Sequence, residues 1–308
     1  MAVKMNMADE WSATAEAYSV NFIEHFNGSV PHLNMQDGRN LMVSRVASFL
    51  EGKDNPVVLD VAAGSGEPAL SIAKEMPHAT VYGTDFAPGM VDMMRKRCYE
   101  AGITNLKAQI EDGHALSGFA NASVDVVTCS WGLESMPGHQ KAIEQFHRVL
   151  KPGGMAIFSA WDKDPNSIAI KMIRVITTLR SRGSGPVDGI PSDFQRLGGD
   201  EGWKAMLKAG FTNVNTSQVA IPLFVPPNVG LRDLFSYMIT PTPINGVLSA
   251  IEKSGRPNVR EEARAMFESQ VLADIAQGRG PTGPGLGWNA YYASPAFYMT
   301  AVIVEGHR

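Results

Sequence analysis

Four short segments carry residue types that could hold a nucleotide-like ligand. In the first, an apolar β-branched run ends in Asp60, and small residues follow up to Gly66. Gly64 and Gly66 permit a tight turn and let a ligand approach where a Cβ would block it. Free N–H groups at the start of the next helix can face an anionic group. The segment departs from the dinucleotide fingerprint at Ala62, where a glycine would stand, and a plain tight turn is the alternative.

Asp85 ends the next apolar run, 25 positions after Asp60. In nucleotide-binding sheets, an acid at this place accepts hydrogen bonds from ribose hydroxyls. A carboxylate suits an uncharged 2′-OH and disfavours a 2′-phosphate. The alternative role is a helix N-cap, which is common for Asp after a strand. Phe86, the next residue, could lie along an adenine face.

Two more polar segments follow the third and fourth apolar runs. Residues 111–114 (Glu-Asp-Gly-His) offer carboxylates that can accept a hydrogen bond from the exocyclic amine of adenine. His114 is expected to satisfy backbone groups in this polar loop. Residues 129–134 follow the fourth run, and we expect this segment to lie nearest to any reacting group.

The elements that must position these segments are strands alternating with helices. Five segments predict parallel strands: residues 56–61, 79–84, 106–110, 124–129 and 155–160. Right-handed crossovers place the carboxyl ends of such strands on one edge of the sheet, and ligands bind there. Two later strands, 212–224 and 297–304, bring the total to seven. The sequence thus predicts an α/β protein with a doubly wound, Rossmann-like, mostly parallel sheet.

Helical segments outside the sheet suggest a cover over the ligand. Residues 1–50 are expected to form an N-terminal helical lid, whose aromatic side chains either face a small-molecule site or only pack on the core. Residues 226–290 are expected to form a helical cap inserted between the last two strands. The expected core then comprises residues 51–225, and residues 291–308 supply its last strand.

Composition argues against several classes of protein. A net charge of −4 disfavours general binding to nucleic acid phosphates. Cys98 and Cys129 form no metal pattern or disulfide scaffold, which fits a reducing compartment. No run is long and apolar enough for a membrane span, and residues 1–9 lack the apolar stretch of a signal peptide. We therefore expect a cytoplasmic protein with no nucleic acid partner and no metal.

Four motifs together resemble the class I S-adenosylmethionine-dependent methyltransferases: residues 59–66 (LDVAAGSG), 84–90 (TDFAPGM), 111–116 (EDGHAL) and 148–154 (RVLKPGG). More narrowly, they resemble the small-molecule "type 11" group that includes quinone-biosynthesis methyltransferases. The likeness covers residues 10–165 well and the C-terminal half only loosely. It implies S-adenosylmethionine as the cofactor and methyl transfer by direct displacement.

The resemblance also implies roles for individual residues. The small residues of the first motif would line the methionine part of the cofactor, and Asp85 would hold the ribose. The family usually has Gly where this chain has Ala62. Aromatic faces would favour the sulfonium cation. The implied cofactor-binding set is Asp60, Ala62, Gly64, Gly66, Asp85, Phe86, Met90, Asp112, Gly113, Ser130 and Trp131.

The acceptor is expected to be a small apolar or aromatic metabolite, because the helical additions are rich in aromatic residues. Candidate acceptor-binding residues are Trp11, Tyr18, Glu134, Tyr237 and Tyr291. A general base is needed only for an acceptor that is protonated at working pH, and the sequence assigns none. The alternative function is a methyltransferase-fold cyclase or isomerase that binds S-adenosylmethionine without transferring methyl. A homodimer is compatible with either function.

Overall fold

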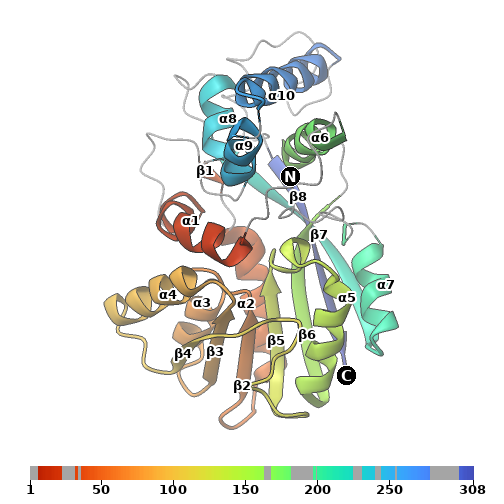
Figure 1. Cartoon of the computed structure of the whole chain (residues 1–308). Helices are drawn as coiled ribbons and strands as arrows, with labels where there is room; N and C mark the ends of the chain where they lie inside the picture. The colour runs from red at the N-terminus through yellow and green to blue at the C-terminus, as the bar shows by residue number, and fades with distance from the viewer. Residues whose placement is uncertain are drawn as a thin grey trace.

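The computed structural model describes residues 6–22, 32–33, 36–162, 168–181, 197–198, 200–224, 231–239, 244–253, 255–277 and 298–308. Its centre is one mixed sheet with the strand order β1-β7-β8-β6-β5-β2-β3-β4 (Figure 1). The strands are β1 (His32–Leu33), β2 (Val57–Val61), β3 (Thr80–Asp85), β4 (Leu106–Ile110), β5 (Val124–Ser130), β6 (Leu150–Trp161), β7 (Thr212–Phe224) and β8 (Tyr298–His307).

Five neighbouring strands, from β6 to β4 in the sheet order, run parallel. Strand β8 is antiparallel to both β6 and β7. This arrangement confirms the expected doubly wound, mostly parallel sheet of seven strands. The two-residue β1, which pairs antiparallel with the end of β7, was not expected. The order reverses between β2 and β5, and this switch point is where such sheets hold ligands.

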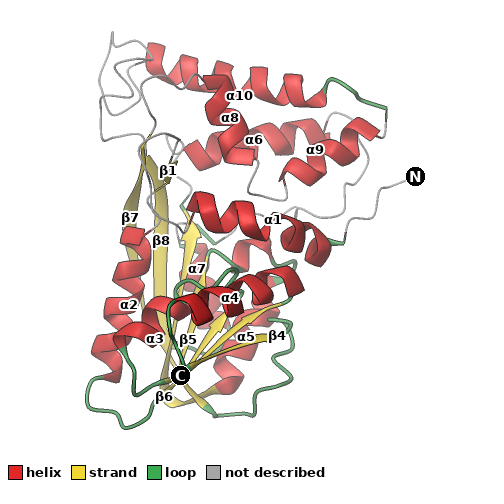
Figure 2. Ribbon diagram, turned by 90° about the vertical axis from the view of Figure 1, so that its left-hand side faces the viewer, coloured by secondary structure: helices red, strands yellow, loops and turns green. Residues whose placement is uncertain are grey.

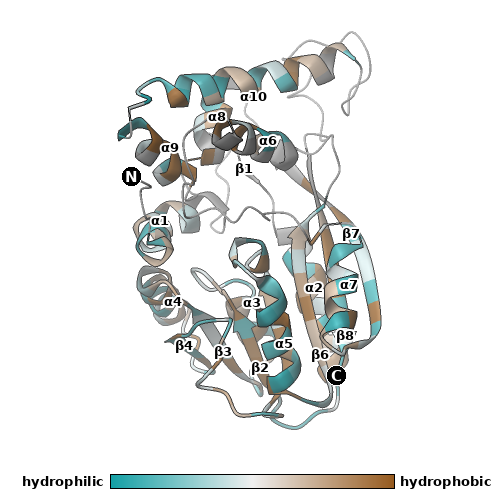
Figure 3. Cartoon of the chain, turned by 45° about the vertical axis from the view of Figure 1, so that its right-hand side comes forward, coloured by the Kyte–Doolittle hydropathy of each residue, from teal (hydrophilic) through white to brown (hydrophobic). Residues whose placement is uncertain are grey.

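Both faces of the sheet are covered by helices, so its central strands are apolar on both sides. Val58 packs on one face with α2 (Gln36–Leu50), α3 (Ala69–Glu75) and α4 (Pro88–Glu100). Its neighbour Leu59 packs on the other face with α5 (His139–Val149) and α7 (Glu201–Lys208). Successive strand residues point to opposite faces, which explains this division. In Figure 3 the hydrophobic colours accordingly follow the strands and the hydrophilic colours mark the outside of α5.

A second group of helices lies beyond the carboxyl ends of the parallel strands (Figures 1 and 2). It contains α6 (Ile168–Ser181), α8 (Leu231–Ile239), α9 (Ile244–Lys253) and α10 (Val259–Ala276). One apolar cluster joins them through Leu179, Leu234, Val247 and Phe267. The sequence placed α6 in the core range, whereas its apolar face packs with these cap helices.

Helix α1 (Met7–Phe22) lies between the cap helices and the sheet and contacts α4 (Figure 2). The contact depends on Gly89, because a Cβ there would fall 2.8 Å from the backbone of Ser12. The Gly89 N–H also donates to Ser12 Oγ at 3.0 Å. A glycine at the start of α4 thus seats the N-terminal helix beside the strand ends.

Candidate functional site

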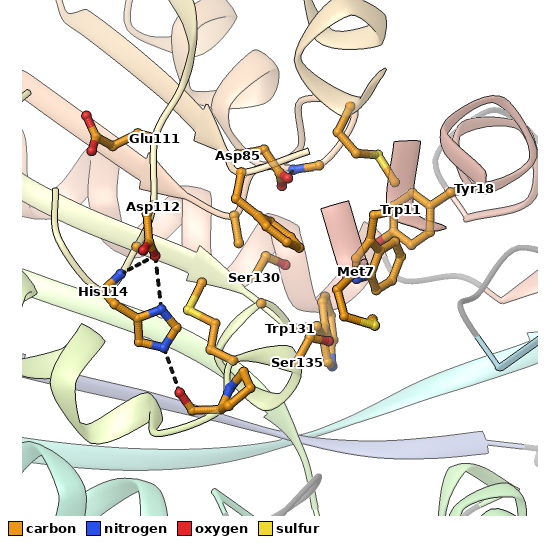
Figure 4. Close-up of a pocket in the computed structure, with 18 residues that line it drawn as sticks. Met7, Trp11, Tyr18, Asp85, Glu111, Asp112, His114, Ser130, Trp131 and Ser135 are labelled. Carbon is orange, nitrogen blue, oxygen red and sulfur yellow. Dashed lines mark hydrogen bonds and ion pairs between the residues drawn. The ribbon is translucent and has the colours of Figure 1, made fainter. Parts of the chain in front are cut away.

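A cavity of about 220 Å³ lies at the carboxyl ends of β2, β3, β4 and β5. Its wall includes side chains from α1 and from the loops that follow the four strands (Figure 4). Nine of the eleven residues implied as cofactor contacts line it: Ala62, Gly64, Asp85, Phe86, Met90, Asp112, Gly113, Ser130 and Trp131. The strand-end rule therefore brings these residues together from four separate segments.

Asp85 is held in place by the backbone on both sides of its carboxylate. Oδ2 accepts from the Gly64 N–H at 2.9 Å, and Oδ1 accepts from the Ala87 N–H at 2.9 Å. Each oxygen has a second lone pair for a ligand hydroxyl. The N-cap of α4 is Ala87 and has no side-chain cap bond, so Asp85 holds the turn before the helix rather than capping it. Burial raises the pKa of Asp85 to about 6, while the backbone N–H bonds oppose this rise.

Asp60 and Gly66 lie behind the cavity wall rather than in it. The Asp60 carboxyl is fully buried, accepts from the Ala69 N–H at 3.1 Å and accepts from Thr128 Oγ1 at 2.6 Å. Burial raises its pKa to about 7. Gly66 has a positive φ of 119°, and a Cβ on it would fall 2.5 Å from Leu70 Cδ1. Both residues shape the turn between β2 and α3.

Ala62, which stands where the family usually has glycine, packs against Gly132 in the loop after β5. Ala62 adopts a left-handed backbone with φ of 54°, which costs about 1–2 kcal/mol in a residue with a Cβ. A Cβ on Gly132 would fall 2.5 Å from the Ala62 methyl group. The Ala62 methyl is thus accommodated because Gly132 has no side chain.

In the loop after β4, two neighbouring acids have different hydrogen-bond partners. Glu111 accepts hydrogen bonds from the Ser117 N–H and hydroxyl and from the Gly118 N–H, and these contacts fold its own loop. The Asp112 carboxylate accepts from the backbone and ring of His114 instead. The side chain of Asp112 is 62% exposed and lies at the cavity wall. Of the two, Asp112 is the better placed for a ligand amine.

Aromatic rings form the side of the cavity away from Asp112 (Figure 4). Trp11 and Tyr18, both on α1, meet edge to face with ring centroids 5.8 Å apart. Trp131 lies across from them with φ of 55°, and its ring is 5.1 Å from that of Trp161. The Trp131 N–H donates to the Ser159 carbonyl at 3.1 Å, which fixes this loop on β6.

Sequence reasoning missed Arg39, which is buried behind Tyr18. The guanidinium is 2% exposed, hydrogen-bonds Tyr18 and lies near the Glu67–Arg97 ion pair. Burial lowers the pKa of Arg39 and raises that of Tyr18. The signal was present in α2, because Arg39 has the same helical phase as the buried residues Met42, Val43, Val46 and Leu50.

Glu134 lies beside the cavity but does not line it. It is 3% exposed, and its Oε2 accepts from the Trp161 N–H at 3.0 Å. Its Oε1 is buried and has no hydrogen-bond partner among the residues that the structure describes. Burial raises the pKa of Glu134 to about 8. The carboxyl thus favours its neutral form at this buried position.

The structure describes only some of the other residues expected to contact the acceptor. Trp11 and Tyr18 line the cavity. Tyr237 belongs to α8, but its side chain is outside the described residues, and Tyr291 lies outside them altogether.

Within the described ranges, no group of three or more His, Cys, Asp or Glu could hold a metal ion. None of the described helices has the length and apolarity needed to cross a membrane.

Comparison with known proteins gives a consistent family. A model of the "Methyltransferase domain" family matches residues 58–154. Demethylmenaquinone methyltransferase of Chlorobaculum parvum is 31% identical over 183 residues, which cover 56% of this chain and 73% of that protein. The enzyme of the same name from Deinococcus radiodurans is 36% identical over 101 residues, covering 32% of this chain and 41% of that protein.

Solved structures show the same fold at low identity. The YcgJ protein of Bacillus subtilis has a TM-score of 0.57 and 19% identity, over 89% of this chain and 98% of that chain. The [4+2]-cyclase SpnF has a TM-score of 0.53 and 16% identity, over 97% of this chain and 93% of that chain. At these identities the likeness is one of fold alone.

Proposed function

The chain belongs to the class I S-adenosylmethionine-dependent methyltransferases related to quinone-biosynthesis enzymes, and we propose that it methylates a small apolar or aromatic metabolite. S-adenosylmethionine is its cofactor. One observation carries the proposal for the acceptor. The cavity has the Asp112 carboxylate at one end and the rings of Trp11, Tyr18 and Trp131 at the other, and Asp85 lies between them.

The residues present fit the cofactor. We assign the ribose hydroxyls to Asp85, whose two oxygens each have a lone pair left after their backbone bonds. Phe86 is a large aromatic side chain left 40% exposed at the cavity, which suits stacking on adenine. Gly64, with φ of 55°, brings its backbone close to the ligand. Its neighbour Tyr18, which Arg39 hydrogen-bonds from behind, lies near the site that we assign to the methionine part.

When bound, S-adenosylmethionine supplies an electrophilic methyl group on a positively charged sulfur. The chain's own task is then to align the acceptor and exclude water. The faces of Trp131 and Tyr18 favour a cation between them. We assign the junction of cofactor and acceptor to these two residues, and the closing cover to residues 1–50 and 226–290. Because α6 packs with the cap, we add its residues to that cover.

The relatives' names support an aromatic acceptor, since demethylmenaquinone methyltransferase is named for a quinone substrate. The cavity's aromatic side suits a planar apolar ring. The cyclase SpnF shares the fold, so methyltransferase-fold cyclisation is the second candidate. A cytoplasmic location is part of the proposal and is supported by two buried free thiols, Cys98 and Cys129.

The test is methyl transfer from labelled S-adenosylmethionine to a panel of hydroquinones and phenols, followed by mass spectrometry. The expected result is a labelled product one methyl group heavier than its parent. An Asp85→Asn protein, which keeps shape but loses charge, serves as the matched control and should bind cofactor more weakly. Consumption of an acceptor without label in the product would favour the cyclase instead. Binding of NAD but not of S-adenosylmethionine would overturn the assignment of the cavity.

A further inference from the structure

His114 makes three hydrogen bonds that join two loops of the cavity wall. Its backbone N–H donates to Asp112 Oδ1 at 2.9 Å. Its ring Nδ1 lies 3.0 Å from the same oxygen, and its ring Nε2 lies 2.8 Å from the Pro137 carbonyl oxygen. The dashed lines in Figure 4 trace this chain of contacts. Asp112 follows β4, whereas Pro137 lies between the short helix Leu133–Ser135 and α5.

The two partners of the ring are both hydrogen-bond acceptors, and this determines which ring nitrogens donate. A carbonyl oxygen only accepts hydrogen bonds, so Nε2 donates to Pro137. An ionised carboxylate also only accepts. A neutral imidazole carries a single N–H, so both ring contacts are donated together only by the imidazolium form of His114. Burial would raise the pKa of Asp112, but the His114 bonds oppose this and the pKa is lowered overall. Lys141 of α5 adds a further positive charge near the Asp112 carboxylate, which keeps this oxygen an acceptor.

The second loop carries the residues next to the acceptor side of the cavity. Met136 packs on the first loop, because a Cβ on Gly113 would fall 3.0 Å from Met136 Cε. Ser135 and Met136 line the cavity themselves. Trp131 precedes the helix Leu133–Ser135 by two positions. A side chain that holds Pro137 therefore also restrains the segment leading back to Trp131.

We propose that His114 is a positioning residue with two separable tasks. Through Nδ1 it holds the Asp112 carboxylate toward the exocyclic amine of adenine. Through Nε2 it holds residues 132–137 against the cofactor loop. The inference rests on the proposed cofactor site and adds to it a residue that the sequence offered only as a loop-stabilising histidine. One imidazole then links the adenine end of the cavity to its acceptor end.

Two amide substitutions can separate the tasks, because each amide nitrogen replaces one ring nitrogen. In His114→Asn the side-chain amide lies near the position of Nδ1, so the contact with Asp112 is kept and that with Pro137 is lost. In His114→Gln the longer side chain places its amide near the position of Nε2, so the contact with Pro137 is kept. The side-chain contact with Asp112 is lost, and the backbone N–H bond to Asp112 Oδ1 remains. His147→Gln on α5 is the matched control, since that ring packs on Phe211 instead.

The first measurement is calorimetric binding of S-adenosylhomocysteine and of S-inosylhomocysteine, which lacks the exocyclic amine. We expect His114→Gln to weaken S-adenosylhomocysteine binding by about 10-fold, the scale of one hydrogen bond to a charged group. It should leave S-inosylhomocysteine binding within about twofold. His114→Asn and His147→Gln should leave both dissociation constants within about twofold of those of the unsubstituted protein.

The second measurement is amide hydrogen exchange of residues 130–138 in the S-adenosylhomocysteine complex. Exchange should be faster in His114→Asn and unchanged in His114→Gln. Equal effects of both variants in both measurements, or equal loss of both ligands in His114→Gln, would show a general structural role and overturn the inference. If the unsubstituted protein binds S-adenosylhomocysteine and neither variant changes any measurement, the inference about His114 is overturned and the proposed function stands. Failure of the unsubstituted protein to bind it would overturn the proposed function as well.

Discussion

Replacing Glu134 by glutamine should remove a pH-dependent loss of stability. The carboxyl is 3% exposed, and within the described part of the chain the Trp161 N–H is the one group that stabilises its charged form. Burial raises its pKa from 4.5 to about 8 in the folded protein. A raised carboxyl pKa means that the folded chain binds the proton more tightly than the unfolded chain. Stability from this group is therefore complete below about pH 4.5 and is lost as the pH rises toward 8.

The size of the effect follows from linkage between proton binding and folding. Each pH unit between the unfolded and folded pKa values costs about 1.4 kcal/mol of unfolding free energy. Between about pH 5.5 and pH 7.5, Glu134 should thus cost the protein about 2–3 kcal/mol. For a chain of 308 residues, this corresponds to about 3–5 °C in Tm. Glutamine has nearly the same shape and cannot ionise, so Glu134→Gln should not lose this stability.

The assay is thermal unfolding of both proteins at pH values from 5.5 to 7.5 (about half-unit steps suffice to resolve the slope). Asp60 and Asp85 also have raised pKa values, about 7 and about 6, and add pH dependence of their own. Their contribution is common to both proteins and cancels in the difference. The Tm difference should widen steadily in favour of Glu134→Gln as the pH rises. Parallel curves would refute the reasoning, because Glu134 would then ionise in the folded protein as it does in the unfolded chain.

Four further predictions concern the cavity wall. Asp85→Ala should weaken S-adenosylmethionine binding by about 1.5–3 kcal/mol in calorimetry, since a charged acceptor is lost; unchanged affinity would place the ribose elsewhere. In the unsubstituted protein, affinity should also fall below about pH 6 as Asp85 takes up a proton. Tyr18→Ala should slow single-turnover methyl transfer far more than it weakens cofactor binding, and equal small changes would make α1 a scaffold only. Gly132→Ala should destabilise the fold by about 1–3 kcal/mol through overpacking on Ala62, and adding Ala62→Gly should restore the Tm; failure of this rescue would show that the clash lies elsewhere.

Local patterns were sufficient to predict the sheet. Most of the parallel strands are apolar runs, as in Val57–Val61, and the segments after them carry small, acidic or aromatic residues. Because parallel strands end on one edge, their order along the chain already implied that Asp85, Asp112 and Trp131 would meet. The cavity lining agrees with that implication for nine of the eleven residues named.

The same patterns could not separate residues in the cavity wall from those behind it. Asp60 and Asp85 both end a strand, yet Asp60 is fully buried between Ala69 and Thr128 while Asp85 faces the cavity. The difference depends on which neighbour supplies hydrogen bonds. Thr128 is 68 positions away from Asp60, so no local periodicity records their contact.

By itself, the sequence determined the order of strands and helices, the edge on which ligands bind and the family, because these depend on local propensity, periodicity and motif spacing. Tertiary structure alone decided the pairings of distant residues: Arg39 with Tyr18, His114 with Pro137, Ala62 against Gly132, and α6 with the cap. It also decided which carboxyls lose their water, and hence why Glu134 favours its neutral form. Burial and close packing are properties of the assembled chain, since they depend on residues that meet only when the fold is complete.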